Sequence, residues 1–195
     1  SYDAWPDAAI AGALAAGRAH NLRLVGPGSL GVRVPGARLD ASLLVHDGRP
    51  GDLALVARSG AVVNATLAWA EGHGVGFSGV VSLGQKADVD VGDLLDWFAM
   101  DGRTRAILVH VETITNPRKF MSAARAAART KPVVVLRSGV TRDLPRELDT
   151  LCGRLAPTDR VYDAAFSRAG FVRVSDIDEV FEAAETVSRF RGGAG

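Results

Sequence analysis

Short apolar runs alternate with longer segments of helical length along most of the chain, and this alternation constrains the fold more than any other feature. The first run is continuously apolar, as in a strand buried on both faces of a parallel sheet. Strands that alternate with helices imply right-handed βαβ crossovers. The sequence therefore predicts an α/β fold, a flavodoxin-like doubly wound sheet of five parallel strands that binds ligands at their carboxyl ends. The expected strands are residues 53–57, 76–83, 106–111, 132–136 and 171–174.

Helix starts are marked by residues that satisfy the free N–H groups of a first turn. Asp90 and Asp93 have the spacing of a capping box. Asn116 precedes Pro117, and proline loses no hydrogen bond at the first helical position. Ser59 is a further N-cap candidate. The expected helices span residues 59–71, 90–100, 117–129 and 158–169, and Ser175 with Asp178 opens the last one.

The first 51 residues do not follow this alternation. Residues 7–19 have the pattern of a helix, and residues 22–25 have that of a short strand. Together they look like the last helix and strand of a preceding α/β domain, so we expect the sequence to begin inside a longer polypeptide. Glycine and proline are frequent in residues 26–51, which we interpret as a connector outside the core.

Charge and composition exclude several classes of function. The formal net charge is +1, which gives no electrostatic reason to expect a nucleic acid or a membrane surface as partner. No apolar run approaches the roughly 20 residues that a membrane helix needs. The single cysteine, Cys152, excludes an internal disulfide and a cysteine-based zinc site, and no metal is predicted. We expect a cytoplasmic protein, and the frequent Ala, Gly and Arg favour a bacterial genome of high GC content.

Five stretches, in their order and spacing, resemble the ADP-forming acyl-CoA synthetases, a branch of the succinyl-CoA synthetase superfamily. They are residues 23–31, 58–60, 81–90, 131–139 and 161–166. The resemblance implies three parts. Residues 1–35 are the C-terminal remnant of a CoA-binding Rossmann-like domain, residues 36–52 are a connector, and residues 53–192 are a flavodoxin-like ligase domain.

The resemblance also implies a mechanism. In that family, a histidine on a mobile loop takes a phosphoryl group from an acyl phosphate and passes it to ADP on an ATP-grasp module. The stretch that aligns with this loop is residues 150–157, and Leu151 stands in the histidine position. A leucine has no lone pair with which to attack phosphorus. Cys152 stands where the family has threonine, and no histidine is evident near it in sequence to stabilise a thiolate. The site is therefore interpreted as degenerate.

Other positions retain parts of the family pattern. Arg58, Ser59 and Gly60 follow a strand and open a helix, so their N–H groups can face a phosphate; simple capping by Ser59 would use the same residues. Lys86 is a second candidate for ligand binding, or only shapes its turn. Glu112 matches the carboxylate that partners the family's histidine, here a vestige. The end of the CoA-binding domain is represented by Gly26, Pro27, Gly28 and Ser29, the last two in place of the family's Asn and Cys.

We expect a non-catalytic domain that is regulatory or senses CoA or acyl-CoA. The resemblance places such domains in larger proteins, as in protein acetyltransferases with a GNAT module. Two alternatives stay open, a fragment of an active acid–thiol ligase and a purely structural partner domain. Expected partners are a phosphate-containing or CoA-type small molecule, and further domains of the same polypeptide or an ATP-grasp partner. A homodimer is a further option.

Overall fold

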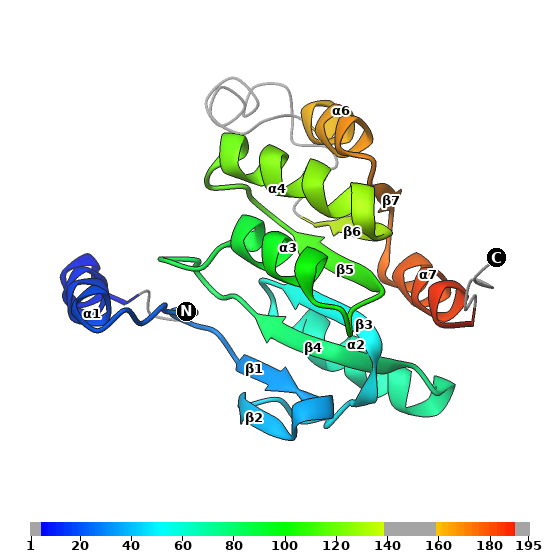
Figure 1. The fold of residues 1–195 in the computed structure, drawn as a ribbon, viewed down its shortest axis with the longest axis horizontal. Coiled ribbons are helices and arrows are strands. Elements are labelled where there is room, and N and C mark those ends of the chain that lie inside the picture. Colours follow the sequence, from blue (N-terminus) through cyan, green and yellow to red (C-terminus); the bar gives the residue numbers. More distant parts are fainter. Residues whose placement is uncertain (1–4, 139–158, 190–195) are drawn as a thin grey trace, which may run out of the picture.

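The computed structural model describes residues 5–138 and 159–189. In these residues one sheet of seven strands forms, in the order β2-β1-β4-β3-β5-β6-β7 (Figure 1). The strands are β1 (Gly31–Val34), β2 (Leu39–Ser42), β3 (Arg49–Ala57), β4 (Gly76–Ser82), β5 (Ala106–Val111), β6 (Val133–Arg137) and β7 (Val172–Val174). The helices are α1 (Asp7–Ala19), the 3-10 turn η1 (Pro35–Ala37), α2 (Gly60–His73), α3 (Val91–Met100), α4 (Pro117–Thr130), α6 (Asp159–Ala169) and α7 (Ile177–Arg189).

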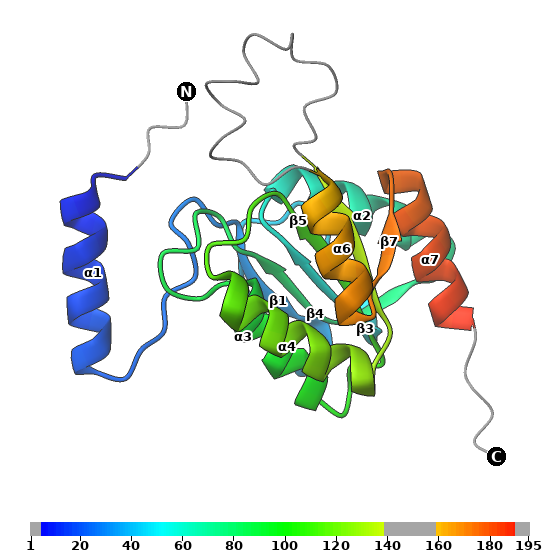
Figure 2. The same cartoon turned by 90° about the horizontal axis from the view of Figure 1, so that it is seen from above.

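The five predicted parallel strands are confirmed, as β4-β3-β5-β6-β7. Apart from β7 and the first half of β3, nearly all of their residues are buried, because helices cover both faces of the sheet. Helices α3, α4 and α6 pack on one face and α2 and α7 on the other (Figure 2). Leu55 of β3 pairs with Val80 of β4 on one side and with Leu108 of β5 on the other. Burial of such chains stabilises the fold by about 1.5–3 kcal/mol each.

The sheet has two more strands than the five that were predicted, because the segment interpreted as a connector supplies β1 and β2. Residues 26–51 contain β1 and β2, and β1 pairs antiparallel with both β2 and β4. The turn into β1 needs Gly31, whose φ is +97° and whose added Cβ would lie 2.1 Å from the Ala41 carbonyl oxygen. Arg33 is buried between the strands, where its guanidinium lies 2.6 Å from a carboxylate oxygen of Asp40. The division into three domains stays a prediction.

The predicted strand at residues 22–25 is also wrong. Leu24 instead uses its backbone groups on a neighbouring turn: its N–H donates to the Asp88 carboxylate at 2.8 Å, and its carbonyl accepts from the Val89 N–H at 3.1 Å. The helix before it, α1, forms at the predicted residues and stands apart from the sheet (Figures 1 and 2). Only Gly17 of α1 is buried.

Helix starts follow their predicted caps in two of four cases. Asp90 and Asp93 form the capping box of α3, and Asn116 accepts the Lys119 N–H of α4 at 3.1 Å. Ser59 stands at the N-cap of α2, but its side chain forms no capping hydrogen bond. At the start of α7 the capping acceptor is Asp176, not Ser175, because the Glu179 N–H donates to the Asp176 carboxylate at 2.9 Å.

None of the helices in the described ranges combines the length and the apolar character that crossing a lipid bilayer requires.

Candidate functional site

Predicted site residues from three strand ends meet at the carboxyl edge of the parallel strands. Arg58 directly follows β3, Lys86 lies in the turn after β4, and Glu112 directly follows β5. The neighbours β3 and β5 are followed by α2 and α4, which lie on opposite faces of the sheet. This is the topological switch point, where sheets of this order bind their ligands.

Arg58 and Glu112 form an ion pair across this switch point: the Arg58 Nη1 donates to the Glu112 Oε2. The two side chains are 42% and 25% exposed, so water screens their attraction and the pair contributes about 0–1 kcal/mol to stability. Its effect is geometric. The pair holds one cation and one anion side by side at the open edge of the sheet.

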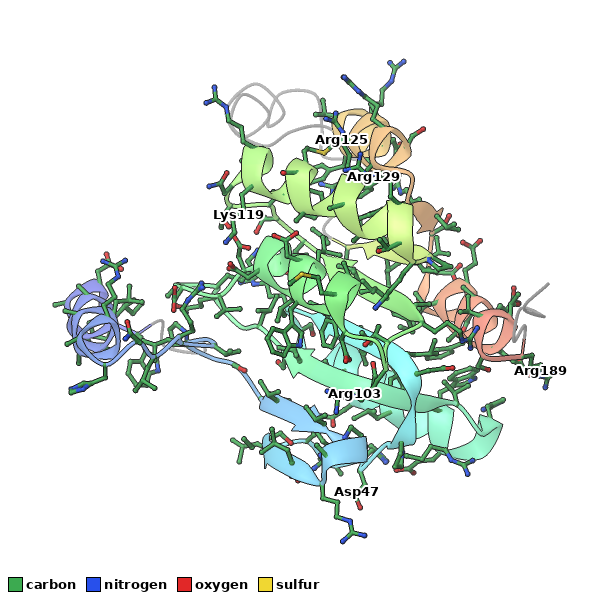
Figure 3. All side chains as sticks on the ribbon, in the orientation of Figure 1. Asp47, Arg103, Lys119, Arg125, Arg129 and Arg189 are labelled. Carbon is green, nitrogen blue, oxygen red and sulfur yellow. The ribbon has the colours of Figure 1, made fainter. Side chains whose placement is uncertain are left out.

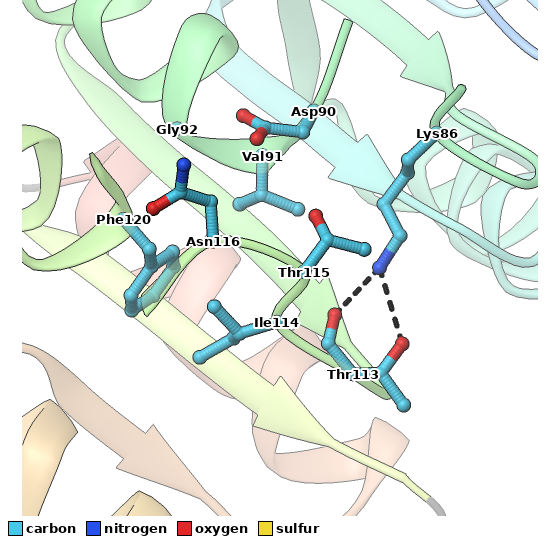
Figure 4. A pocket seen from close by; sticks show the side chains of 9 residues that line it. All are labelled: Lys86, Asp90, Val91, Gly92, Thr113, Ile114, Thr115, Asn116 and Phe120. Carbon is cyan, nitrogen blue, oxygen red and sulfur yellow. Dashed lines mark hydrogen bonds between the residues drawn. The ribbon is translucent and has the colours of Figure 1, made fainter. Parts of the chain in front are cut away.

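Lys86 carries the second cation of the edge. Its ammonium donates to the Thr113 carbonyl at 2.5 Å, with the Thr113 hydroxyl at 3.3 Å (Figure 4). Burial lowers the pKa of Lys86, and the charge of Arg58 acts in the same direction; Glu112 and Asp90 oppose the shift. Two neighbouring cations, one of them half-buried, create an edge where an added anion is stabilised.

The turn of Lys86 packs against the loop that contains Gly26, Pro27, Gly28 and Ser29. The Gln85 N–H donates to the Pro27 carbonyl at 2.8 Å, and the Ala87 N–H donates to the Gly26 carbonyl at 3.0 Å. Ser29 donates its hydroxyl to the Ser82 carbonyl at the end of β4. The structure therefore brings the predicted end of the CoA-binding domain beside Lys86.

Ser59 and Gly60 present the N-terminus of α2 to the same edge. The first N–H groups of a helix have no partner within it and carry the positive end of the helix dipole. Gly60 also has a packing role, because a Cβ there would lie 2.2 Å from Leu30 Cδ1. The Ser59 hydroxyl forms no capping hydrogen bond, so simple side-chain capping is not observed. Binding of an anion at this turn stays a prediction.

His110 is the site residue that sequence reasoning missed. It is the penultimate residue of β5, its side chain is 3% exposed, and its Nε2 lies 2.8 Å from the hydroxyl of Ser138, which directly follows β6. Its Nδ1 has no hydrogen-bond partner among the described residues. Burial lowers the pKa of His110 and keeps the imidazole neutral, although the charge of Glu112 opposes this. A lone polar residue inside the apolar run of β5 was the available signal.

A small pocket opens between the turn of Lys86 and the start of α4 (Figure 4). Its volume of about 10 Å³ is enough for one water-sized group. Thr113, Asn116 and the carboxylate of Asp90 line it, and Asp90 also pairs with Lys119 at 3.1 Å. A ligand larger than this does not fit inside the pocket.

Leu151 and Cys152 lie outside the described residues. Within the described ranges, no group of three or more His, Cys, Asp or Glu side chains could hold a metal ion.

Comparison with known proteins places most of the chain in one family. The model of a family described as succinyl-CoA ligase like flavodoxin domain matches residues 50–187. The ADP-forming acetate–CoA ligase I subunit alpha of Pyrococcus furiosus is 38% identical over 171 residues, which is 88% of this chain and 37% of the relative. The ADP-forming acetate–CoA ligase I of Archaeoglobus fulgidus is 36% identical over 172 residues, 88% of this chain and 25% of the relative.

Solved structures give the same result. The acetyl-coenzyme A synthetase 1 of Ca. Korarchaeum cryptofilum, described as dinucleotide forming and solved in complex with phosphate and ADP, superposes with a TM-score of 0.82 at 28% identity. The match covers 93% of this chain and 40% of that one. The chain thus spans less than half the length of these relatives.

Proposed function

Since this chain belongs to the family of succinyl-CoA ligase-like flavodoxin domains and is an ADP-forming acyl-CoA synthetase-like domain, we propose that it binds a phosphate-containing ligand of the CoA type without transferring a phosphoryl group. The observation that carries the proposal is the meeting of Arg58, Lys86 and the start of α2 at the switch point. Inorganic phosphate, CoA and acyl-CoA all offer the anionic oxygens that such an edge recognises.

Three contacts support the binding part of the proposal. The guanidinium of Arg58 and the ammonium of Lys86 stand on adjacent strand ends, and the first N–H groups of α2 point along the same edge. Burial lowers the pKa of Lys86, with Arg58 as a further cause, so a bound anion would relieve an unfavourable charge distribution. The loop of Gly26 to Ser29 packs against the turn of Lys86, so it is the neighbouring element that the rest of the ligand would meet.

The absence of phosphoryl transfer is proposed from the histidines. The chain has four, and position 151 of the loop that resembles the phosphorylated loop is leucine. His20 and His73 are exposed on α1 and α2, and His46 lies near α2, where it approaches Glu71 at 3.2 Å. His110 adjoins the site but is buried, with its Nε2 bonded to Ser138. None of them offers an exposed imidazole to an acyl phosphate at the edge.

Activity as a ligase fragment is the second candidate, favoured by the retained Glu112 and by the names of the relatives. It requires a phosphoryl acceptor other than a histidine of the loop. We expect no acid-labile phosphoprotein when the chain is incubated with radiolabelled acetyl phosphate or ATP. We also expect that Leu151→His alone will not create one, because the surrounding loop has diverged as well. A stable phosphohistidine in that variant would contradict this and indicate recent loss.

The binding proposal is tested by thermal unfolding with phosphate, CoA or acetyl-CoA. A ligand at 100 times its Kd stabilises the folded state by about 2.7 kcal/mol, a rise in Tm of several degrees. Lys86→Met should abolish most of this rise, and Arg18→Met on the exposed helix α1 is the matched control. If none of the three ligands raises the Tm of the unmodified chain, the domain is a structural partner.

The wider setting is proposed on the resemblance alone. A regulatory domain of this kind would belong to a larger cytoplasmic protein, such as an acetyltransferase with a GNAT module in a bacterium, or would meet an ATP-grasp partner. The mass and terminal peptides of the native polypeptide decide between these. A chain that carries no acetyltransferase module would exclude the first setting.

A further inference from the structure

Helices α4 and α6 lie side by side on one face of the sheet (Figures 1 and 2). Their side chains line a groove between them. Phe120 of α4 and Phe166 of α6 meet beneath it with ring centroids 6.2 Å apart, which fixes the distance between the helices. The floor is apolar and made of short side chains. The groove has a volume of about 430 Å³ and is lined by Met121, Arg125, Arg160, Val161, Ala164, Ala165 and Arg168.

The rims of this groove are unusually basic. In α4, Arg118, Arg125 and Arg129 are seven and four residues apart, so they share one stripe of the helix. In α6, Arg160 and Arg168 are about two turns apart. All five arginines are exposed. Figure 3 labels two of them, Arg125 and Arg129, where α4 borders α6.

Among the described residues, these arginines form none of the ion pairs that several other cations of the molecule make. Across residues 5–138 and 159–189, no ion pair involves any of the five. In contrast, Lys119 on α4 pairs with Asp90 and Asp93, and Arg173 near α6 pairs with Asp159. Like charges one helical turn apart, such as Arg125 and Arg129, repel each other. An acidic partner would remove this repulsion.

We propose that the groove between α4 and α6 binds an amphipathic helix of a partner protein, with apolar side chains on the floor and acidic side chains against the arginines. A helix-in-groove complex needs an apolar channel for residues at spacings of three and four, and charges on its rims set the orientation of the helix. Both features are present here. The proposal does not depend on the ligand site, which lies at the carboxyl edge of the strands.

Other anionic partners fit the groove less well. Single-stranded nucleic acid binds through exposed aromatic rings on which bases stack, and no aromatic residue lines this groove. A membrane surface takes up protruding apolar side chains, whereas Ala164 and Ala165 lie in the floor of a depression between two helices. Neither partner would use a recessed apolar floor between two basic rims.

The test uses fluorescence anisotropy with the whole 195-residue chain and two labelled peptides. The first is a helix-forming peptide of about 18 residues with leucines along one face and glutamates beside them. The second has the same composition in an order without helical periodicity. We expect saturable binding of the first peptide, at least about tenfold tighter than the second.

Substitutions on the rims and in the floor of the groove test whether the amphipathic peptide binds there. The double variant Arg125→Glu and Arg168→Glu should weaken binding of the amphipathic peptide at least about tenfold. The control Arg103→Glu and Arg189→Glu, which makes the same change in net charge at exposed arginines elsewhere (Figure 3), should change it less than about twofold. Ala164→Trp fills the floor without changing the charge and should also prevent binding. Circular dichroism confirms that each variant is folded.

Several outcomes would overturn the proposal. Equal binding of the two peptides, or equal loss in both double variants, would show attraction by net charge alone. Unchanged binding by folded Ala164→Trp would show that the floor is not used. Binding to vesicles containing phosphatidylserine or to poly(U) RNA, without binding of the amphipathic peptide, would assign the arginines to a different class of partner.

Discussion

The parallel strands and the β1–β2 hairpin belong to one sheet but are stabilised by different chemistry. In residues 53–57 of β3, in β5 and in β6, almost every side chain is apolar and buried between two layers of helices. In the hairpin, β2 is exposed along most of its length, and the buried side chain between the strands is that of Arg33. The stability of the parallel strands therefore depends on buried apolar volume, while the stability of the hairpin depends on the buried cation of Arg33 and on the backbone conformation of Gly31.

The largest effect is expected from removing apolar volume in the parallel strands. Leu108 in β5 is 1% exposed, whereas Leu39 in β2 is 50% exposed. Leu108→Ala should lower the free energy of unfolding by about 2–5 kcal/mol, because it leaves a cavity. Leu39→Ala should change it by about 0.5 kcal/mol or less. Urea unfolding followed by circular dichroism measures both, and similar losses would remove the distinction between the two regions.

A smaller effect is expected from the backbone of the hairpin. Gly31→Ala forces a Cβ to within 2.1 Å of the Ala41 carbonyl oxygen at a φ of +97°, so we expect a loss of about 1–3 kcal/mol. Gly36→Ala is the matched control, since a Cβ at residue 36 meets no atom within 4 Å. Hydrogen exchange should increase in residues 31–42 more than in β5. Uniform exchange across the sheet would show that hairpin and parallel strands unfold as one unit.

The smallest effect is expected from pH, because His110 in the parallel strands and Asp40 in the hairpin change the stability in different pH ranges. Burial lowers the pKa of His110 below 6.5, so the unfolded chain takes up a proton first and stability is lost as the pH falls below 6.5. The hydrogen bond from Arg33 lowers the pKa of Asp40 in the hairpin below 3.8, so its contribution is present above pH 3.8 and lost only as the pH falls further. Urea titrations between about pH 7.5 and pH 5.5 should therefore show a slope that His110→Gln reduces. An unchanged slope would assign the effect to other groups.

The sequence predicted the parallel strands well because their signal is local. Runs such as residues 53–57 and 106–111 are apolar whichever strands they pair with. The hairpin carries no such signal. Its strands are four residues each, Arg33 stands inside one, and Leu39–Ser42 is mostly exposed. Residues 22–25 had an apolar strand pattern, but the backbone of Leu24 is satisfied by Asp88 and Val89, which are distant in sequence.

The sequence indicates that the candidate site residues lie at one edge of the sheet, but it does not give their contacts, and their role as a site stays a prediction. Residues at strand ends meet in any parallel sheet, so Arg58, Lys86 and Glu112 could be grouped in advance. The ion pair between Arg58 and Glu112 depends on the order of strands, which no local pattern fixes. The bond between His110 and Ser138 joins residues that are 28 positions apart. The basic groove was missed because its arginines come from two helices that are adjacent only in the fold.

The backbone conformation of Lys86 gives the proposed ligand site a consequence for how this sequence changes over evolutionary time. Its φ of 58° is a left-handed conformation, which costs a residue with a side chain about 1–2 kcal/mol relative to glycine. Selection for folding alone would therefore favour glycine at this position. If the ammonium group no longer had a ligand to bind, drift would be expected to replace Lys86 early, while the buried strands around it stayed apolar.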